Sequence, residues 1–196
     1  MLDASLGYYI NPLVNVLFGV VLLGERMRRL QAVASLLALA GVLWMVNIHG
    51  HLPWLSLGLA ATFALYALLR KTASIDALIG LSVETFILTI PAFLGLIWLA
   101  AYGRLPTDAR TWLLLAGGAG VTALPLLWFV EAARRLDLKT LGFLQFTSPT
   151  LQFAIAFLAF GEPLPRARLL IFALIWMAVA LYCLDAALHA RRDPRL

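Results

Sequence analysis

Long apolar runs separated by short polar breaks dominate this chain. A helix of about 20 mostly apolar residues is long enough to cross the hydrocarbon core of a bilayer. No run shows the alternation of apolar and polar residues that is typical of a half-buried β-strand. The pattern predicts an all-α integral membrane protein with seven transmembrane helices. The expected segments are about 5–23, 30–48, 53–69, 78–101, 111–130, 140–160 and 167–187.

The breaks carry most of the charge, and the side on which the cations fall predicts the orientation of the chain. Successive loops between spanning helices lie on opposite sides of the membrane. Assigned in this way, eleven Lys and Arg residues fall on one side and four on the other. Loops on the cytoplasmic side carry the excess of Lys and Arg in membrane proteins. We therefore expect a multi-pass protein of the bacterial inner membrane whose C-terminus, the short basic tail 191–196, is cytoplasmic. The larger group is Arg26, Arg28, Arg29, Arg70, Lys71, Arg134, Arg135, Lys139, Arg191, Arg192 and Arg195, and the smaller is Arg104, Arg110, Arg166 and Arg168.

The composition narrows the range of partners. Hydrophobic residues make up 63% of the chain and charged residues 13%, against about half and about a quarter in soluble domains. Lipid is therefore the expected partner of most of the surface, and the net charge of +5 does not indicate a nucleic acid. The single cysteine, Cys183, excludes an internal disulfide. We expect neither a metal nor a cofactor, and the oligomeric state is not readable.

One sequence pattern occurs twice. The stretch NPLVNVLFGVVLLGER begins at Asn11 and SPTLQFAIAFLAFGEP begins at Ser148, and in each a proline precedes a Gly-Glu pair by the same distance. The first copy lies on the first expected helix and the second on the sixth. Because five helices separate equivalent positions, the two copies cross the membrane in opposite directions. The sequence thus predicts an inverted repeat, which many secondary transporters use to build their substrate site at the bilayer midplane.

This repeat resembles the EamA domain of the drug/metabolite transporter superfamily, which is built as two five-helix halves. The stretches LGYYINPLVNVLFGVVLLGER, LYALLRK, DALIGLSVET and LGFLQFTSPTLQFAIAFLAFGEPL are similar to those of RarD-type members, named for chloramphenicol sensitivity. The resemblance implies a ten-helix transporter fold in which 1–48 form the last two helices of the first repeat. Residues 49–190 then form the complete second repeat, and about three further helices are expected before the first one here.

The two repeated prolines lead to a candidate substrate site. A proline inside a helix has no N–H for the carbonyl four residues earlier, so Pro12 and Pro149 are expected to act as hinges. Amide side chains near each proline either line a shared midplane cavity or hydrogen-bond neighbouring helices. Asn15 and Gln152 are expected to face each other across that cavity. The expected lining residues are Tyr8, Asn11, Asn15, Gln145 and Gln152, with a similar claim for Ser148.

Three acidic residues have expected roles. Glu84 lies within a span, where an ionisable group is a functional hypothesis by default. It either binds substrate or a coupling proton, or it pairs with Arg70 or Lys71 at the helix end. Glu25 and Glu162 close the two repeats and are expected to serve in helix-end salt bridges or in closing a gate.

The sequence lacks the residues that retinal proteins, intramembrane enzymes and ATP-driven transporters need. The lysines lie at helix ends, so no mid-helix lysine is available for a retinal Schiff base. Motifs of intramembrane enzymes and of ATP binding are absent, so no enzymatic activity is expected. The expected function is secondary transport of small metabolites or drugs by alternating access, with protons as a candidate coupling ion. The alternative is a truncated, non-transporting or regulatory membrane fragment.

Overall fold

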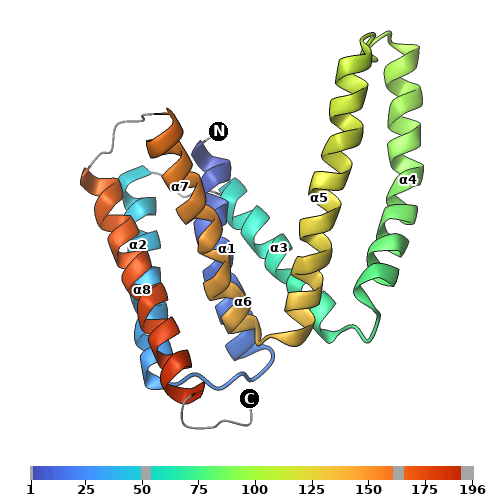
Figure 1. The fold of residues 1–196 in the computed structure, drawn as a ribbon. Helices are drawn as coiled ribbons and strands as arrows, with labels where there is room; N and C mark the ends of the chain where they lie inside the picture. Colours follow the sequence, from blue (N-terminus) through green and yellow to red (C-terminus); the bar gives the residue numbers. More distant parts are fainter. Residues whose placement is uncertain (1, 50–53, 161–165, 191–196) are drawn as a thin grey trace. The chain divides into compact units, whose positions relative to one another are not determined.

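The structure, a computed structural model, describes residues 2–49, 54–160 and 166–190, and within these ranges it is helical with no strand (Figure 1). The chain divides into two units, 1–69 with 136–196 and 70–135, which are described separately. The boundary falls inside the third helix. The helices are α1 (Leu2–Val21), α2 (Arg29–His49), α3 (Trp54–Thr72), α4 (Ala77–Ala101), α5 (Ala109–Arg135), α6 (Leu138–Gln145), α7 (Thr147–Phe160) and α8 (Arg166–Ala190).

The first unit contains two antiparallel helix pairs. The carboxylate of Glu25, just after α1, accepts from the first backbone N–H groups of α6, so the end of α1 meets the start of α6. Arg28, before α2, pairs with Asp185 near the end of α8 at 2.9 Å. Helix α1 therefore runs opposite to α6, and α2 opposite to α8 (Figure 1). This confirms the opposite directions of the two motif-bearing helices, while the ten-helix repeat stays a prediction.

Small side chains allow α2 and α8 to pack closely. Ala34 and Ala38 of α2 and Ala178 of α8 are completely buried. A Cβ added to Gly41 would lie 3.4 Å from the side chain of Ile175 and 3.5 Å from the carbonyl oxygen of Ile171. Helices in lipid associate through such small residues because packing and hydrogen bonds replace the hydrophobic effect as the driving force.

The sixth expected segment, 140–160, is not one helix. It divides at Phe146 into α6 and α7, although the two together still form one stretch, Leu138–Phe160, that is long and apolar enough to cross a membrane. Pro149 lies in the first turn of α7, where proline fits best because its missing N–H is not needed there. It cannot donate to the carbonyl of Gln145. Pro12, by contrast, lies inside the continuous helix α1.

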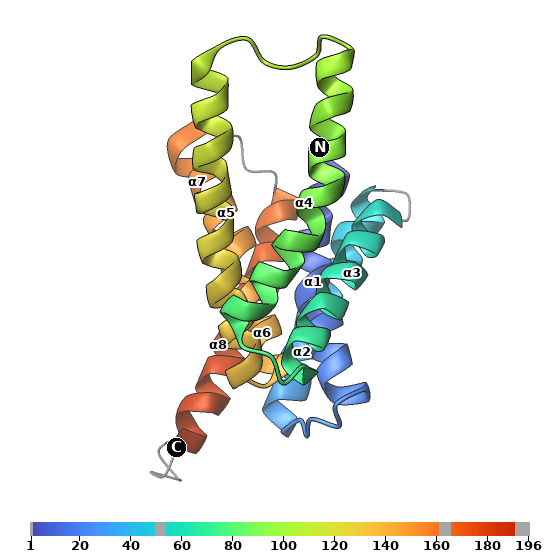
Figure 2. The same ribbon diagram turned by 90° about the vertical axis from the view of Figure 1, so that its right-hand side faces the viewer.

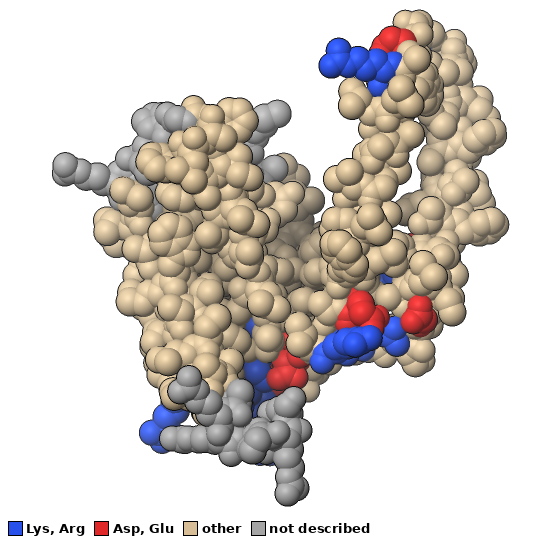
Figure 3. Space-filling view, viewed as in Figure 1, with Lys and Arg blue, Asp and Glu red and all other residues tan. Residues whose placement is uncertain are grey.

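The second unit is a hairpin of α4 and α5 (Figure 2). Asp76 caps α4 by accepting from the N–H of Leu78 at 2.9 Å, and this bond is the main reason why the pKa of its carboxyl lies below the usual value. Charged side chains gather at the two ends of the hairpin and leave its length apolar (Figure 3). That distribution suits a segment whose middle lies in hydrocarbon.

Five stretches are long and apolar enough to cross a membrane, with α6 and α7 counted as one. Of the remaining helices, α1 contributes a shorter apolar stretch from Tyr8 to Val21, and α3 carries Arg70 and Lys71 in its last turn. The protein is therefore an all-α, multi-pass membrane protein. The five stretches are Arg29–Ile48, Ala77–Ala101, Ala109–Arg135, Leu138–Phe160 and Leu169–His189.

Candidate functional site

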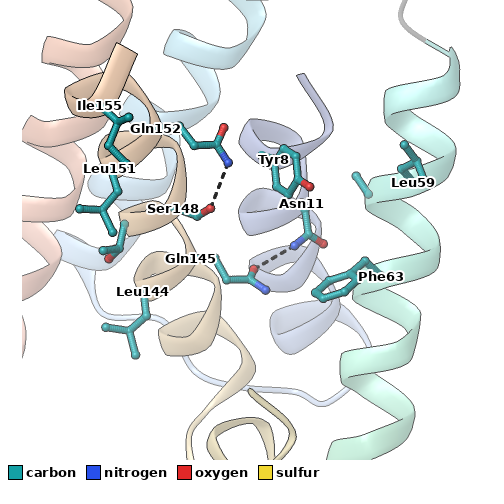
Figure 4. A pocket seen from close by; sticks show the side chains of 12 residues that line it. Tyr8, Asn11, Leu59, Phe63, Leu144, Gln145, Ser148, Leu151, Gln152 and Ile155 are labelled. Carbon is teal, nitrogen blue, oxygen red and sulfur yellow. Dashed lines mark hydrogen bonds between the residues drawn. The ribbon is translucent and has the colours of Figure 1, made fainter. Parts of the chain in front are cut away.

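A pocket of about 710 Å³ opens in the first unit between α1, α3, α6 and α7. Its polar side chains come from α1 and from the α6–α7 segment, and α3 faces them with Leu59 and Phe63 (Figure 4). The volume is within the range of small-molecule sites, which are mostly apolar with a few placed polar groups. The lining residues are Tyr8, Asn11, Leu59, Ala60, Phe63, Leu144, Gln145, Thr147, Ser148, Leu151, Gln152 and Ile155.

Three side-chain amides meet at the base of the polar wall. Gln145 Oε1 accepts from Asn15 Nδ2 at 2.6 Å and from Asn11 Nδ2 at 3.1 Å. Asn15 is completely buried, whereas Asn11 and Gln145 are partly exposed and line the pocket (Figure 4). We call Asn11, Asn15 and Gln145 the amide cluster. It joins α1 to the end of α6 by direct hydrogen bonds between residues that lie 130 and 134 positions apart in the sequence.

Two side-chain oxygens of the amide cluster lack a hydrogen-bond partner among the described residues. The Oδ1 atoms of Asn11 and Asn15 are buried and have no hydrogen-bond partner among the described residues. A buried polar oxygen without a partner costs about 1–3 kcal/mol, so such atoms are uncommon in a finished core. A polar group that is left unsatisfied beside a pocket is a place where a ligand gains affinity.

Gly142 lets α6 come close enough to α1 for these hydrogen bonds to form. A Cβ at this position would lie 2.5 Å from the carbonyl oxygen of Pro12 and 3.3 Å from the Cβ of Asn15. Both prolines of the repeat, Pro12 and Pro149, are themselves fully buried. Pro12, Gly142 and Asn15 therefore meet in one tightly packed contact.

The structure places the predicted lining residues unequally. Tyr8, Asn11, Gln145 and Gln152 line the pocket, and so does Ser148. Asn15 lies outside the lining and contacts Gln145, not Gln152 as expected. The Nε2 atom of Gln152 lies 3.5 Å from Ser148 Oγ (Figure 4). The apolar wall of α3 was not foreseen, because nothing in its sequence distinguishes Leu59 and Phe63 from lipid-facing residues.

Gly24 and Glu25 show what the Gly-Glu ending does in the first copy of the repeated pattern. Gly24 has a φ of +65°, a left-handed backbone conformation that favours glycine, and the N–H of Glu25 bonds the carbonyl of Gly19 at 2.9 Å just after α1. The Glu25 carboxylate then accepts from Leu138 N at 2.6 Å and from Lys139 N at 3.0 Å. Glu25 thus caps α6 through backbone N–H groups, whereas the sequence led us to expect a salt bridge or a gate at this position. Its counterpart Glu162 lies outside the described residues.

Glu84 belongs to the second unit and has a cationic partner there. Its Oε1 atom lies 3.4 Å from Nε of Arg70, whose side chain is only 7% exposed. Arg70 also lies 3.5 Å from the carbonyl oxygen of Ala77, and the missing side chain of Gly80 leaves room for its guanidinium. This geometry matches the second of the two expected roles, pairing at a helix end.

Relatives of the chain share its whole length. An uncharacterized transporter of Pseudomonas aeruginosa is 49% identical over 100% of this chain and 66% of its own length. An uncharacterized transporter of Vibrio cholerae is 46% identical over 100% of this chain and 66% of its own. Protein RarD of Escherichia coli is 44% identical over 100% of this chain and 67% of its own. The chain belongs to the RarD family. No protein-family model matches it.

Membership in the RarD family agrees with the resemblance noted from the repeated pattern. The chain spans about two thirds of the length of these RarD-family relatives. The three relatives are named as transporters or as RarD. The part of the family that this chain represents contains the positions of the pocket, the amide cluster and the Arg70–Glu84 pair.

Proposed function

We propose that the protein is a secondary transporter that moves small metabolites or drugs across the bacterial inner membrane by alternating access. The observation that carries this proposal is the pocket between α1, α3 and the α6–α7 segment, with the amide cluster in its polar wall. The antiparallel motif helices support it, because inverted repeats place substrate sites where the repeats meet. The names of two relatives, which are uncharacterized transporters, point the same way.

The two prolines give this proposal a mechanical basis. Pro12 leaves the carbonyl of Tyr8 without its helical donor, and Pro149 does the same for Gln145. Sharp changes of helix direction occur at such positions. We propose that α1 and the α6–α7 segment bend at these points while the pocket stays between them, so that it opens to one side of the membrane at a time.

Solute flux tests the proposal. One RarD-family relative, from Pseudomonas aeruginosa and 36% identical, is named chloramphenicol-sensitive protein RarD, so labelled chloramphenicol is the first solute to try. Proteoliposomes containing this chain should take it up faster than protein-free liposomes. Gln145→Leu should reduce the uptake by about tenfold, since it removes the shared acceptor of the amide cluster. Asn47→Leu, an exposed amide on α2, is the matched control and should leave uptake unchanged.

The same assay addresses the alternative of a non-transporting fragment. Full-length protein RarD of Escherichia coli, reconstituted in parallel, shows whether the assay detects transport of this solute by a longer relative. Uptake by the relative together with none by this chain would support the alternative. Uptake by this chain that Gln145→Leu leaves unchanged would contradict the pocket as the substrate site.

Proton coupling through Glu84 is a separable part of the proposal. If Glu84 carries the proton, Glu84→Gln should abolish the pH dependence of uptake, because the amide cannot titrate. If it only holds the corner between α3 and α4 through Arg70, uptake per folded molecule should keep its pH dependence while thermal stability falls. The 3.4 Å pair leads us to expect the second result. Asp108→Asn, at the exposed tip of the hairpin, is the control.

A further inference from the structure

The pocket has a polar wall without charge. The six amide and hydroxyl side chains in its lining are neutral, and no Asp, Glu, Lys or Arg belongs to the described lining. Transfer of an ionised group into such surroundings without a counter-charge is strongly unfavourable, whereas a neutral polar group needs only hydrogen bonds. The lining therefore selects against anions and cations alike.

The hydrogen bonds of the amide cluster indicate what the ligand must offer. Each primary amide has one oxygen and two N–H donors, yet the three amides are joined by only two bonds, and both use Gln145 Oε1. The Asn11–Gln145 bond, at 3.1 Å, is the longer one and lies at the pocket wall. The oxygen of Asn11 has no partner among the described residues. Asn11 can therefore exchange its bond to Gln145 for bonds to a ligand, while Asn15 keeps Gln145 in place.

An amide that is released in this way presents an acceptor and a donor side by side. Its complement is a head group with an adjacent donor and acceptor, such as a carboxamide. The opposite wall suits an apolar body, since Phe63 and Leu59 on α3 face the polar residues across the pocket (Figure 4). Leu151 and Ile155 on α7 extend the apolar lining.

We infer that the pocket binds an uncharged amphipathic solute whose carboxamide-like head pairs with Asn11 and whose apolar body lies against Phe63 and Leu59. This inference rests on the proposed function for its biological meaning, because it names the class of substrate for the same site. Asn15 is a positioning residue in it, since it holds Gln145 and does not line the pocket.

Four compounds with the same carbon skeleton separate charge from hydrogen bonding. 3-Phenylpropanamide is neutral and carries both donor and acceptor. Its N,N-dimethyl derivative is neutral without a donor, 3-phenylpropanoate is an anion, and 3-phenylpropylamine is a cation at neutral pH. Saturable binding to the protein in lipid nanodiscs would be measured by equilibrium dialysis, with empty nanodiscs correcting for partition into lipid. The primary amide should bind about tenfold more tightly than each of the others, a difference of about 1.4 kcal/mol.

A variant with a new charge at Asn11 should bind the cationic compound more tightly than the unaltered protein does. A misfolded protein would lose binding and could not give this result. Asn11→Asp keeps the side-chain shape and adds a carboxylate to the pocket wall, so the preference should shift from the amide to 3-phenylpropylamine by about tenfold. Asn47→Asp adds the same charge on the exposed surface of α2 and should leave the order of the four compounds unchanged. An Asn11→Asp protein with the wild-type order would overturn the inference.

The binding results are independent of transport. Tighter binding of the anion or the cation to the unaltered protein, equal binding of the dimethyl derivative, or no saturable binding of any of the four would overturn the inference. Preferential binding of the primary amide without its flux into proteoliposomes would preserve the inference and contradict the proposed transport. Flux of a charged analogue in preference to the amide would support transport and overturn the substrate class.

Discussion

At the scale of single residues, Glu25 shows how a side chain far away in sequence can take over a local role. Asp137 precedes α6 and is of a type preferred at helix N-caps, but its side chain makes no capping bond. Its carboxylate instead pairs with Lys139 Nζ at 2.7 Å. The capping acceptor is Glu25, which lies 113 residues before Leu138 in the sequence. A carboxylate suits this place because the first N–H groups of a helix lack partners and carry partial positive charge.

We predict that Glu25→Ala lowers the free energy of unfolding by about 1–3 kcal/mol, because two N–H groups at a partly buried helix end lose their acceptor. Glu25→Gln should lose less, since one oxygen remains to accept one of the two bonds. Unfolding in mixed micelles, followed by circular dichroism, measures both. The control is Glu131→Gln, whose carboxylate pairs with Arg135 on the exposed end of α5 and should matter by at most about 1 kcal/mol. Equal losses at both sites would contradict the capping role.

At the scale of helices, the two copies of the repeated pattern are built differently. Both copies are preceded by a Leu-Gly pair, in LGYYINP and in LGFLQFTSP, where Gly7 precedes Pro12 by five positions and Gly142 precedes Pro149 by seven. The longer of these two stretches is the one that breaks, at Phe146 between α6 and α7. The extra residues place Pro149 in the first turn of a new helix, while Pro12 remains inside a continuous one. The two motif helices therefore share a sequence pattern and run in opposite directions, but they differ in shape.

The contact between α1 and α6 depends on Gly142. We predict that Gly142→Ala destabilises the protein by about 1–3 kcal/mol, as overpacking does, because its Cβ would lie 2.5 Å from a backbone oxygen of α1. The displaced helix should also lose the bonds of Asn11 and Asn15 to Gln145, so uptake per folded molecule should fall.

Gly118→Ala is the matched control for this experiment. A Cβ at Gly118 would meet no atom within 4 Å, and alanine is the better helix former by about 1 kcal/mol. This variant should be as stable as the parent or slightly more so in the same thermal unfolding assay. A Gly142→Ala protein with unchanged stability would show that α1 and α6 approach less closely than described.

At the scale of the whole molecule, helices that the repeat makes equivalent are also the ones that pack together in the first unit. Helix α1 packs on α6, and α2, which follows the first motif, packs on α8, which follows the second. Each pair runs antiparallel. A two-fold axis in the membrane plane that exchanges the repeats would exchange α1 with α6 and α2 with α8. Each pair would then lie across the axis, which is the arrangement expected where inverted repeats meet.

Orientation in the membrane is the prediction that belongs to this scale. The eleven-to-four division of Lys and Arg predicts a cytoplasmic C-terminus. Alkaline phosphatase fused to the C-terminus should be inactive, because it folds only in the periplasm. The same enzyme inserted at the α4–α5 tip, near Pro106, should be active, since the tip is one crossing away from Arg70 and Lys71. Strong activity of the C-terminal fusion would reverse the orientation.

The sequence alone determined where the helices are and that they lie in lipid. Continuous apolar runs of spanning length have few other stable arrangements, because in hydrocarbon each backbone group must find its partner within the helix. The paired prolines, the amides beside them and the Gly-Glu endings were also visible, and the opposite directions of the two motif helices followed from counting the helices between them.

Only the tertiary structure decided which of these groups meet. Gln145 rather than Gln152 contacts Asn15, Glu25 rather than Asp137 caps α6, and Arg70 pairs with Glu84. Helical periodicity fixes the face on which a side chain lies, but not the neighbour that this face meets. The neighbour depends on how closely two helices approach, and here Gly142 and the break at Phe146 set that approach.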